Sequence, residues 1–116
     1  MRRVIAAEHK ARIAQLPCVI CSASPVHVAH VRYTSRDDGA EQPGMGRKPD
    51  DWRVVPLCPR HHQTGRDAQH SMGEERFWRE HGINPYALAR ALYGLTDLWE
   101  MERLVLNARG LYPTSG

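Results

Sequence analysis

Long apolar runs and aromatic side chains are both scarce in this chain of 116 residues. No apolar run approaches the ~18 residues that a membrane span needs, so a transmembrane protein is excluded. Aromatic residues make up only 7% of the sequence, which also contains 9 glycines and 8 prolines. We therefore expect one small domain, residues 1–116, with a modest core and many loops.

A cleavable leader and a disulfide framework are not expected either. Residues 1–5 resemble the start of a signal peptide, but Glu8, His9 and Lys10 interrupt the apolar stretch. The odd count of 3 cysteines suits paired disulfides poorly. We expect a cytoplasmic protein without a membrane partner, and its oligomeric state stays open.

The charge balance is mildly basic. Lysine and arginine outnumber aspartate and glutamate by 16 to 13, and the isoelectric point is near 9.0. This excess is compatible with a nucleic acid partner but does not establish one, because many soluble proteins carry a similar charge.

Two short metal-ligand pairs are the strongest chemical feature of the sequence. Cys18 and Cys21 form one pair at C-x-x-C spacing, and Cys58 and His61 form a second pair farther along. Zn²⁺ is held by four thiolate or imidazole ligands in a tetrahedron, and a Cys₃His set of this kind is structural rather than catalytic. The alternative is three buried free cysteines and a surface histidine.

The pattern of apolar residues predicts an α+β fold with a helix at each end. A helix over residues 2–16 is expected to bury Val4, Ala7, Ala11 and Ala14. Strands over residues 26–33 and 52–55 flank a long loop, and a short helix runs from Pro59 towards Gly65. The domain divides into an N-terminal helix (1–17), a zinc-stapled core (18–70) and C-terminal helices (71–116).

Capping residues delimit three helices in the C-terminal part. Ser71 and Glu74 form a capping box for a helix that ends at Gly82. Asn84 begins the next helix, and Thr96 begins the last, which spans residues 96–109. The last helix is apolar around more than one face, which is typical of a helix that is deeply buried or packs on a partner.

Other side chains are assigned to core or surface from the same periodicity. Phe77, Trp78, Trp99 and Met101 are expected in the core. His9 and His81 are expected on the surface.

Three further residues are candidates for catalysis. His30 lies on the first predicted strand, and Asp51 ends the loop before the second strand. His62 follows the zinc ligand His61, so its side chain points ~100° away along the helix, across the hairpin towards His30. A metal held by carboxylate and imidazole, with a neutral histidine as base, suffices for phosphodiester hydrolysis. The alternatives are satisfied surface histidines and a turn aspartate.

The sequence resembles the HNH nucleases over residues 9–85, and it looks most like the phage recombination-enhancement (Ref-like) and prophage members that carry a structural zinc. The matching runs are Leu16-Pro17-Cys18-x-x-Cys21, Val28-Ala29-His30-Val31, Lys48-x-x-Asp51 and Val55-Pro56-Leu57-Cys58-x-x-His61-His62. The resemblance implies a ββα-metal, treble-clef-like core and an enzyme that cuts DNA. It also implies a recombinase–DNA filament as a partner.

The resemblance assigns roles to individual residues. His30 would be the general base, Asp51 would occupy the position of the middle asparagine, and His62 would bind a catalytic Mg²⁺, Mn²⁺ or second Zn²⁺. Asp51 would also bind this metal, because a carboxylate suits a hard cation. Ala29 occupies the position at which most members have a metal ligand. His70 or His27 is the candidate to supply this missing ligand.

Basic residues near this centre are candidate phosphate contacts. They are Arg32, Arg36, Arg47 and Lys48. A basic solvated loop is the alternative.

The sequence therefore predicts a metal-dependent DNA endonuclease. The first alternative is a zinc-stapled DNA-binding module that has lost cleavage, which the alanine at position 29 favours. The second is a zinc-stapled protein-interaction domain that uses the apolar last helix.

Overall fold

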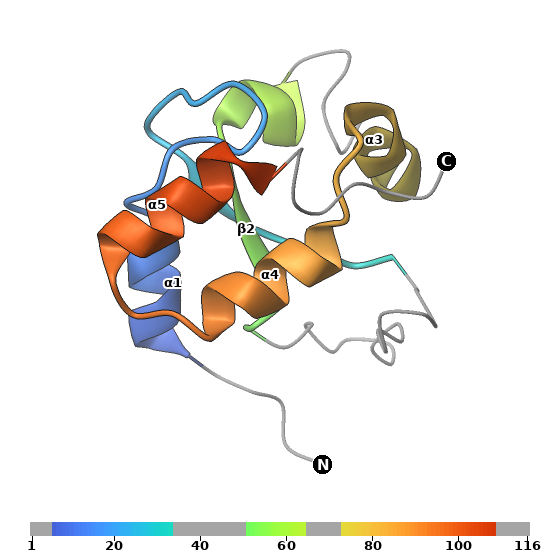
Figure 1. Cartoon of the computed structure of the whole chain (residues 1–116). Coiled ribbons are helices and arrows are strands. Elements are labelled where there is room, and N and C mark those ends of the chain that lie inside the picture. The colour runs from blue at the N-terminus through green and yellow to red at the C-terminus, as the bar shows by residue number, and fades with distance from the viewer. Residues whose placement is uncertain (1–5, 34–50, 65–72, 109–116) are drawn as a thin grey trace.

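A two-stranded antiparallel hairpin lies at the centre of the molecule, with helices packed around it (Figure 1). The structure is a computed structural model, and it describes residues 6–33, 51–64 and 73–108. The elements are, in chain order, α1 (Ala7–Ile13), β1 (His27–His30), β2 (Val54–Leu57), η1 (Arg60–Thr64), α3 (Glu74–His81), α4 (Pro85–Tyr93) and α5 (Leu98–Leu106). The prediction of a small α+β fold is confirmed.

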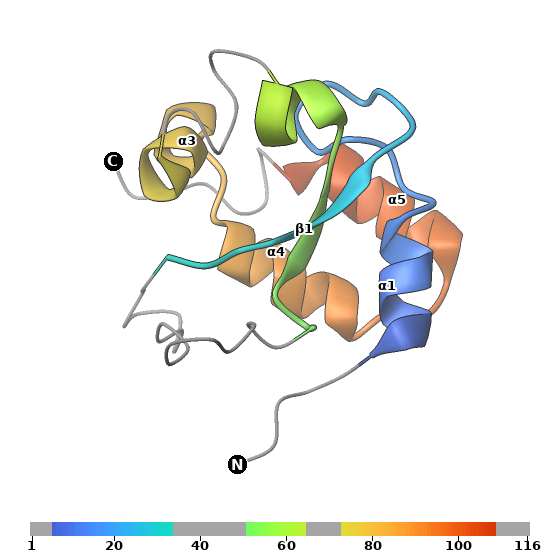
Figure 2. The same ribbon diagram turned by 180° about the vertical axis from the view of Figure 1, so that it is seen from behind.

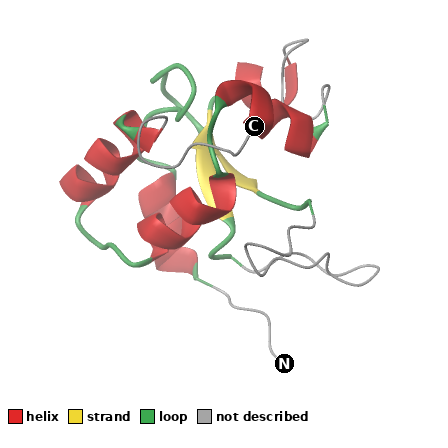
Figure 3. Ribbon diagram, turned by 45° about the vertical axis from the view of Figure 1, so that its right-hand side comes forward, coloured by secondary structure: helices red, strands yellow, loops and turns green. Residues whose placement is uncertain are grey.

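The hairpin is short and is covered by helices. The strands pair antiparallel, with His27 opposite Leu57 and His30 opposite Val54. Every residue of β2 is buried, because α1 and α4 both contact this strand. Seen from behind, the two strands lie in front of α4 and α5, so these helices cover one face of the hairpin (Figure 2). Figure 3 shows how little of the chain is strand.

The pairing of the chain continues beyond β1 and β2. The Val31 amide donates to the Arg53 carbonyl oxygen at 2.8 Å. On the other side of β2, the Val19 amide donates to the Pro56 carbonyl oxygen at 3.0 Å. The turn that carries Cys18 is therefore bound directly to the hairpin.

Helix α1 presents a different face to the core than the alanine pattern predicts. His9 and Ile13 are its buried residues, and Ala7, Ala11 and Ala14 are exposed. An alanine has too little apolar surface to decide which face of a short helix packs inward, so the larger Ile13 decides it. The predictions of an alanine core stripe and of a surface His9 are both wrong.

The ends of the C-terminal helices follow the predicted caps in part. The Asn84 side chain accepts from the amides of Tyr86 and Ala87, and Gly82 ends α3 in the left-handed conformation. Helix α3, however, begins after Gly73 without a side-chain cap, and the carboxylate of Glu74 accepts from the amides of Arg32 and Tyr33 instead. This contact attaches α3 to the end of β1.

The core assignments hold for three of the four predicted side chains. Phe77, Trp78 and Met101 are fully buried, but Trp99 is 65% exposed. Helix α5 turns Met101 and Val105 inward, and Trp99 lies on the opposite side of the helix. The described part of the chain contains no helix that is long and apolar enough to cross a membrane.

The cap of α5 is Asp97 rather than the predicted Thr96, since the Asp97 carboxylate accepts from the Glu100 amide at 3.0 Å. We expect Asp97→Ala to lower the free energy of unfolding by about 1 kcal/mol. Thr96→Ala should change it by less than about 0.5 kcal/mol. Urea denaturation of both variants measures the difference. A larger loss of unfolding free energy in Thr96→Ala than in Asp97→Ala would show that Thr96 is the cap, as the sequence predicts.

Candidate metal centre and histidine–aspartate pair

Three cysteines and one histidine from three segments converge on one point. Cys18 and Cys21 lie in the turn after α1, Cys58 follows β2, and His61 lies in η1. Their ligand atoms all lie within 4.8 Å of one another. All three cysteines are free thiols. The predicted Cys₃His group is therefore present, and it has the composition of a zinc-binding site.

The separations of the donor atoms match those of a tetrahedral zinc site. The Cys21 and Cys58 sulfurs are 3.7 Å apart. The His61 Nδ1 atom lies 3.3 Å from the Cys58 sulfur and 3.9 Å from the Cys18 sulfur. Tetrahedral ligands at ordinary Zn–S and Zn–N lengths are separated by about 3.5–3.8 Å. The four residues can hold Zn²⁺ without a large rearrangement.

Local backbone hydrogen bonds aim the first two sulfurs inward. The Ser22 amide donates to the Cys18 carbonyl oxygen at 2.8 Å, and the Cys18 amide donates to the Ala23 carbonyl oxygen at 2.9 Å. The Ile20 amide points at the Cys18 sulfur at 3.4 Å. Ser22 has a φ of 65°, which closes the turn. Pro17 disfavours continuation of the helix and so leaves the turn free to form.

The thiols of the cluster have opposite electrostatic surroundings. Partial burial, assisted by the neighbouring sulfurs of Cys58 and Cys18, raises the pKa of Cys21 to about 11. Burial also acts to raise the pKa of Cys58, but the amides of His61 and Arg60 outweigh it and lower this pKa. Zinc is bound by thiolates, so metal binding should release protons.

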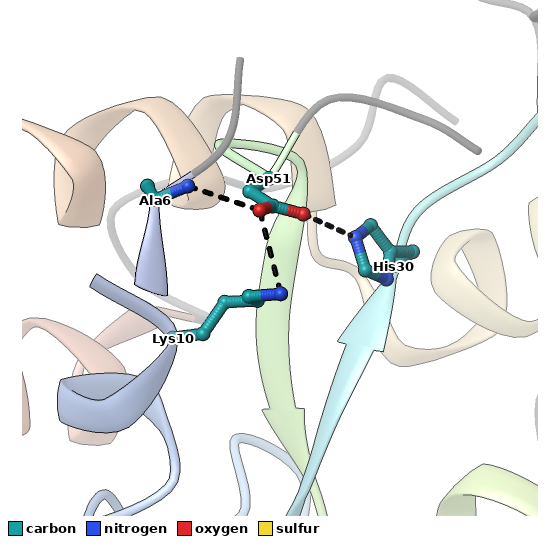
Figure 4. A network of polar contacts seen from close by, with 4 residues as sticks. All are labelled: Ala6, Lys10, His30 and Asp51. Carbon is teal, nitrogen blue, oxygen red and sulfur yellow. Dashed lines mark hydrogen bonds and ion pairs between the residues drawn. The ribbon is translucent and has the colours of Figure 1, made fainter. Parts of the chain in front are cut away.

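A second polar cluster lies at the far end of the hairpin, between α1 and β1 (Figure 4). Nε2 of His30 is 3.2 Å from Oδ1 of Asp51. The other carboxylate oxygen of Asp51 accepts from the Ala6 amide at 3.0 Å and lies 3.4 Å from the Lys10 ammonium. The side chain of Asp51 is only 2% exposed, and that of His30 is 18% exposed. Both oxygens of Asp51 are therefore engaged by the protein.

These contacts decide the charge of both groups. Burial acts to raise the pKa of Asp51, but the Ala6 amide, His30 and Lys10 outweigh it and lower this pKa below 3.8. Burial lowers the pKa of His30 below 6.5, and the hydrogen bond to Asp51 opposes this without cancelling it. At neutral pH the pair is an aspartate anion and a neutral imidazole. The anion accepts the Nε2 proton, which leaves the lone pair on Nδ1.

His62 contacts a different residue than predicted. Its Nδ1 atom lies 2.9 Å from Nδ1 of His27, and the two rings meet edge to face at 5.1 Å. The register explains this contact, because Leu57 at the end of β2 is opposite His27, and η1 follows directly. His30 lies at the other end of β1, so the prediction that His62 points at His30 is wrong.

The remaining predicted residues divide into two groups. Three of them lie in described segments. Arg32 is exposed just after β1, and Ala29 is buried in the core with 1% exposure. The ring of His81 packs against Phe77. Four predicted site residues lie outside the described ranges: Arg36, Arg47, Lys48 and His70.

No protein-family model, curated protein or solved structure matches this chain.

His61 and His62 are adjacent, but only His61 belongs to the Cys₃His cluster. We expect His61→Ala and Cys58→Ala to lose bound zinc and to unfold, because the ligands are dispersed in the unfolded chain and metal binding contributes to folding. His62→Ala should keep about one zinc per chain and its fold. Metal analysis and circular dichroism of the three variants provide the test. Well-folded wild-type protein without zinc would contradict the assignment.

Proposed function

We propose that this protein is a zinc-stabilised endonuclease of the HNH type that hydrolyses phosphodiester bonds in DNA with a divalent cation. Its setting would be phage or prophage DNA recombination or processing in the cytoplasm. The observation that carries the proposal is the His30–Asp51 pair. A neutral, half-buried imidazole held by a buried carboxylate is the arrangement that general-base catalysis requires.

In this proposal His30 removes a proton from the attacking water. The water oxygen forms a bond to phosphorus while its proton moves to Nδ1 of His30. The bond from phosphorus to the 3′-oxygen breaks, and the leaving oxygen then takes up a proton from solvent. The low pKa of His30 keeps Nδ1 unprotonated at neutral pH, so the base is ready when the substrate arrives.

Asp51 acts in this proposal as a positioning residue rather than a metal ligand. Its two oxygens already accept from His30, Ala6 and Lys10, and it is almost fully buried. A metal in place of the Ala6 amide or of His30 would remove the carboxylate partner of that part-buried donor. The carboxylate instead fixes the orientation and the tautomer of the His30 ring.

His27 and His62 are the described residues that best fit the catalytic cation. Their Nδ1 atoms are close enough to share one ion, and imidazole ligands suit Zn²⁺ or Mn²⁺ better than Mg²⁺, which prefers oxygen. His70 is the candidate for a further ligand. A divalent cation held there would lie about 10 Å along β1 from His30, so it would neutralise a neighbouring part of the DNA backbone rather than the phosphate that the water attacks.

Basic residues would hold the DNA backbone against this centre. Arg32 is exposed two residues after His30, and Arg36, Arg47 and Lys48 would extend the contact along the following loop. Such contacts are independent of DNA sequence and sensitive to salt. A recombinase–DNA filament is the proposed source of the substrate.

A DNA-binding module without cleavage is the second candidate. It is favoured by Ala29, whose buried methyl group provides no ligand, and by the engagement of both Asp51 oxygens within the protein. In this case the zinc cluster and the basic residues would remain functional, and the His30–Asp51 pair would be structural.

Nicking of supercoiled plasmid distinguishes the two candidates. We expect His30→Ala to reduce nicking by about 10²–10⁴-fold, because it removes the proton acceptor, and to keep zinc content and DNA affinity. Asp51→Asn should keep more activity than Asp51→Ala, since the amide oxygen still accepts from His30. Raised Mn²⁺ should rescue neither His30→Ala nor Asp51→Ala.

His81→Ala serves as the control for loss of a half-buried histidine outside the pair. Equal nicking by His30→Ala and wild type would contradict the mechanism. Rescue of Asp51→Ala by Mn²⁺ would make Asp51 a metal ligand. If the protein binds DNA but does not nick it with any of the metals, the second candidate, a DNA-binding module without cleavage, is favoured.

A further inference from the structure

Helix α5 presents an apolar face to solvent on its outer side. Three of the four exposed large apolar or aromatic side chains in the described part of the chain belong to this helix: Leu98, Trp99 and Leu106. Trp99 is 65% exposed and Leu106 is 52% exposed. The helix lies at one side of the molecule, at the front in Figure 1 and at the back in Figure 2. Exposed apolar side chains that gather on one element, rather than lying singly, indicate an interaction surface.

The residues of this face repeat at helical spacing. Trp99 and Leu106 are separated by about two turns of the helix, so their side chains lie on one face. Glu102 and Arg103 are exposed and lie between them on the same face. The core-facing residues of α5 are on the opposite side of the helix. We call Trp99, Glu102, Arg103 and Leu106 the outer face of α5.

The order of residues on the outer face is self-complementary. Its ends are apolar, and its midpoint lies between the acidic Glu102 and the basic Arg103. If two copies of the helix pack antiparallel about a two-fold axis at this midpoint, Trp99 of each copy meets Leu106 of the other. Glu102 of each copy then meets Arg103 of the other, which gives two ion pairs. In a parallel arrangement like charges would meet, so the charges select the antiparallel one.

We propose that the outer face of α5 binds the same face of a second copy of this chain in an antiparallel, two-fold pair. The Arg103 guanidinium lies over the Trp99 ring of its own chain, 4.8 Å from the ring centroid. This contact holds both side chains in the outer face. A guanidinium over a ring keeps N–H groups at its edge for a carboxylate, and Glu102 of the second copy provides that carboxylate.

The size of the face sets the strength of the pair. Helix α5 has 9 residues, so it is about 14 Å long. One helix face of this length buries less than the ~800 Å² per partner that a stable complex requires. We therefore expect monomers and dimers in rapid exchange, with a dissociation constant between about 10 µM and about 1 mM.

Sedimentation velocity of the zinc-loaded full chain, from about 10 µM to about 1 mM, tests this proposal. The share of dimer should rise with concentration in the wild type. Glu102→Arg and Arg103→Glu should each weaken association about tenfold or more, because each converts both ion pairs into like-charge contacts. Trp99→Ala should weaken it by a similar factor, since it removes the aromatic anchor of the interface. All three residues are exposed, so the variants should keep their fold and zinc content.

Two combinations restore the charge pattern and so distinguish this interface from others. An equimolar mixture of Glu102→Arg and Arg103→Glu should form mixed dimers, because each chain then meets two opposite charges. The double variant, with both changes in one chain, should associate with itself like the wild type. Glu75→Arg is the matched control, because it reverses an exposed glutamate on α3, and it should leave association unchanged.

Three results would overturn the proposal. The first is a monomer at every concentration, which would leave the outer face of α5 for a different protein. The second is dimerisation that the charge reversals do not weaken, which would place the contact on another surface. The third is loss of association in the double variant, which would contradict the antiparallel pairing. Because the readout is association, none of these results depends on whether the protein cleaves DNA.

Discussion

The Cys₃His cluster is the constraint on which the rest of the structure depends. It joins the turn after α1 to the junction of β2 and η1, which lies far along the sequence from that turn. A two-stranded hairpin is marginal by itself in water, and this one has only four residues in each strand. A bound ion would link these two distant segments into one unit, on which α4 and α5 can pack.

The cluster also bears on where the histidines of the hairpin lie. Cys58 follows Leu57, which is paired with His27, so His62 in η1 is placed against that end of β1. The opposite end of the hairpin holds His30, and Asp51 connects it to α1 through Ala6 and Lys10. The candidate base is thus oriented by a helix that the metal cluster holds in place. The proposed nuclease activity depends on this arrangement.

The sequence predicted the features that depend on residue type and local spacing. The Cys₃His set follows from the chemistry of its ligands, and Asn84 and Gly82 delimit helices through local hydrogen bonds and backbone conformation. Features that depend on tertiary packing were missed. The burial of His9 and the exposure of Trp99 depend on which helix face meets the hairpin, and in α1 the small alanines left that undecided. The contacts of Asp51 with Ala6 and Lys10 join segments that no spacing rule connects.

Amide hydrogen exchange with and without zinc tests the organising role of the cluster most directly. The Val19 amide joins the cysteine turn to Pro56, and the Val31 amide joins the two strands beyond His30. Both amides should be protected in the zinc-loaded protein and should lose protection when the metal is removed, together with the amides of α4. Equal protection in the metal-free protein would show that the hairpin and its helices are stable without the cluster, and would contradict the account.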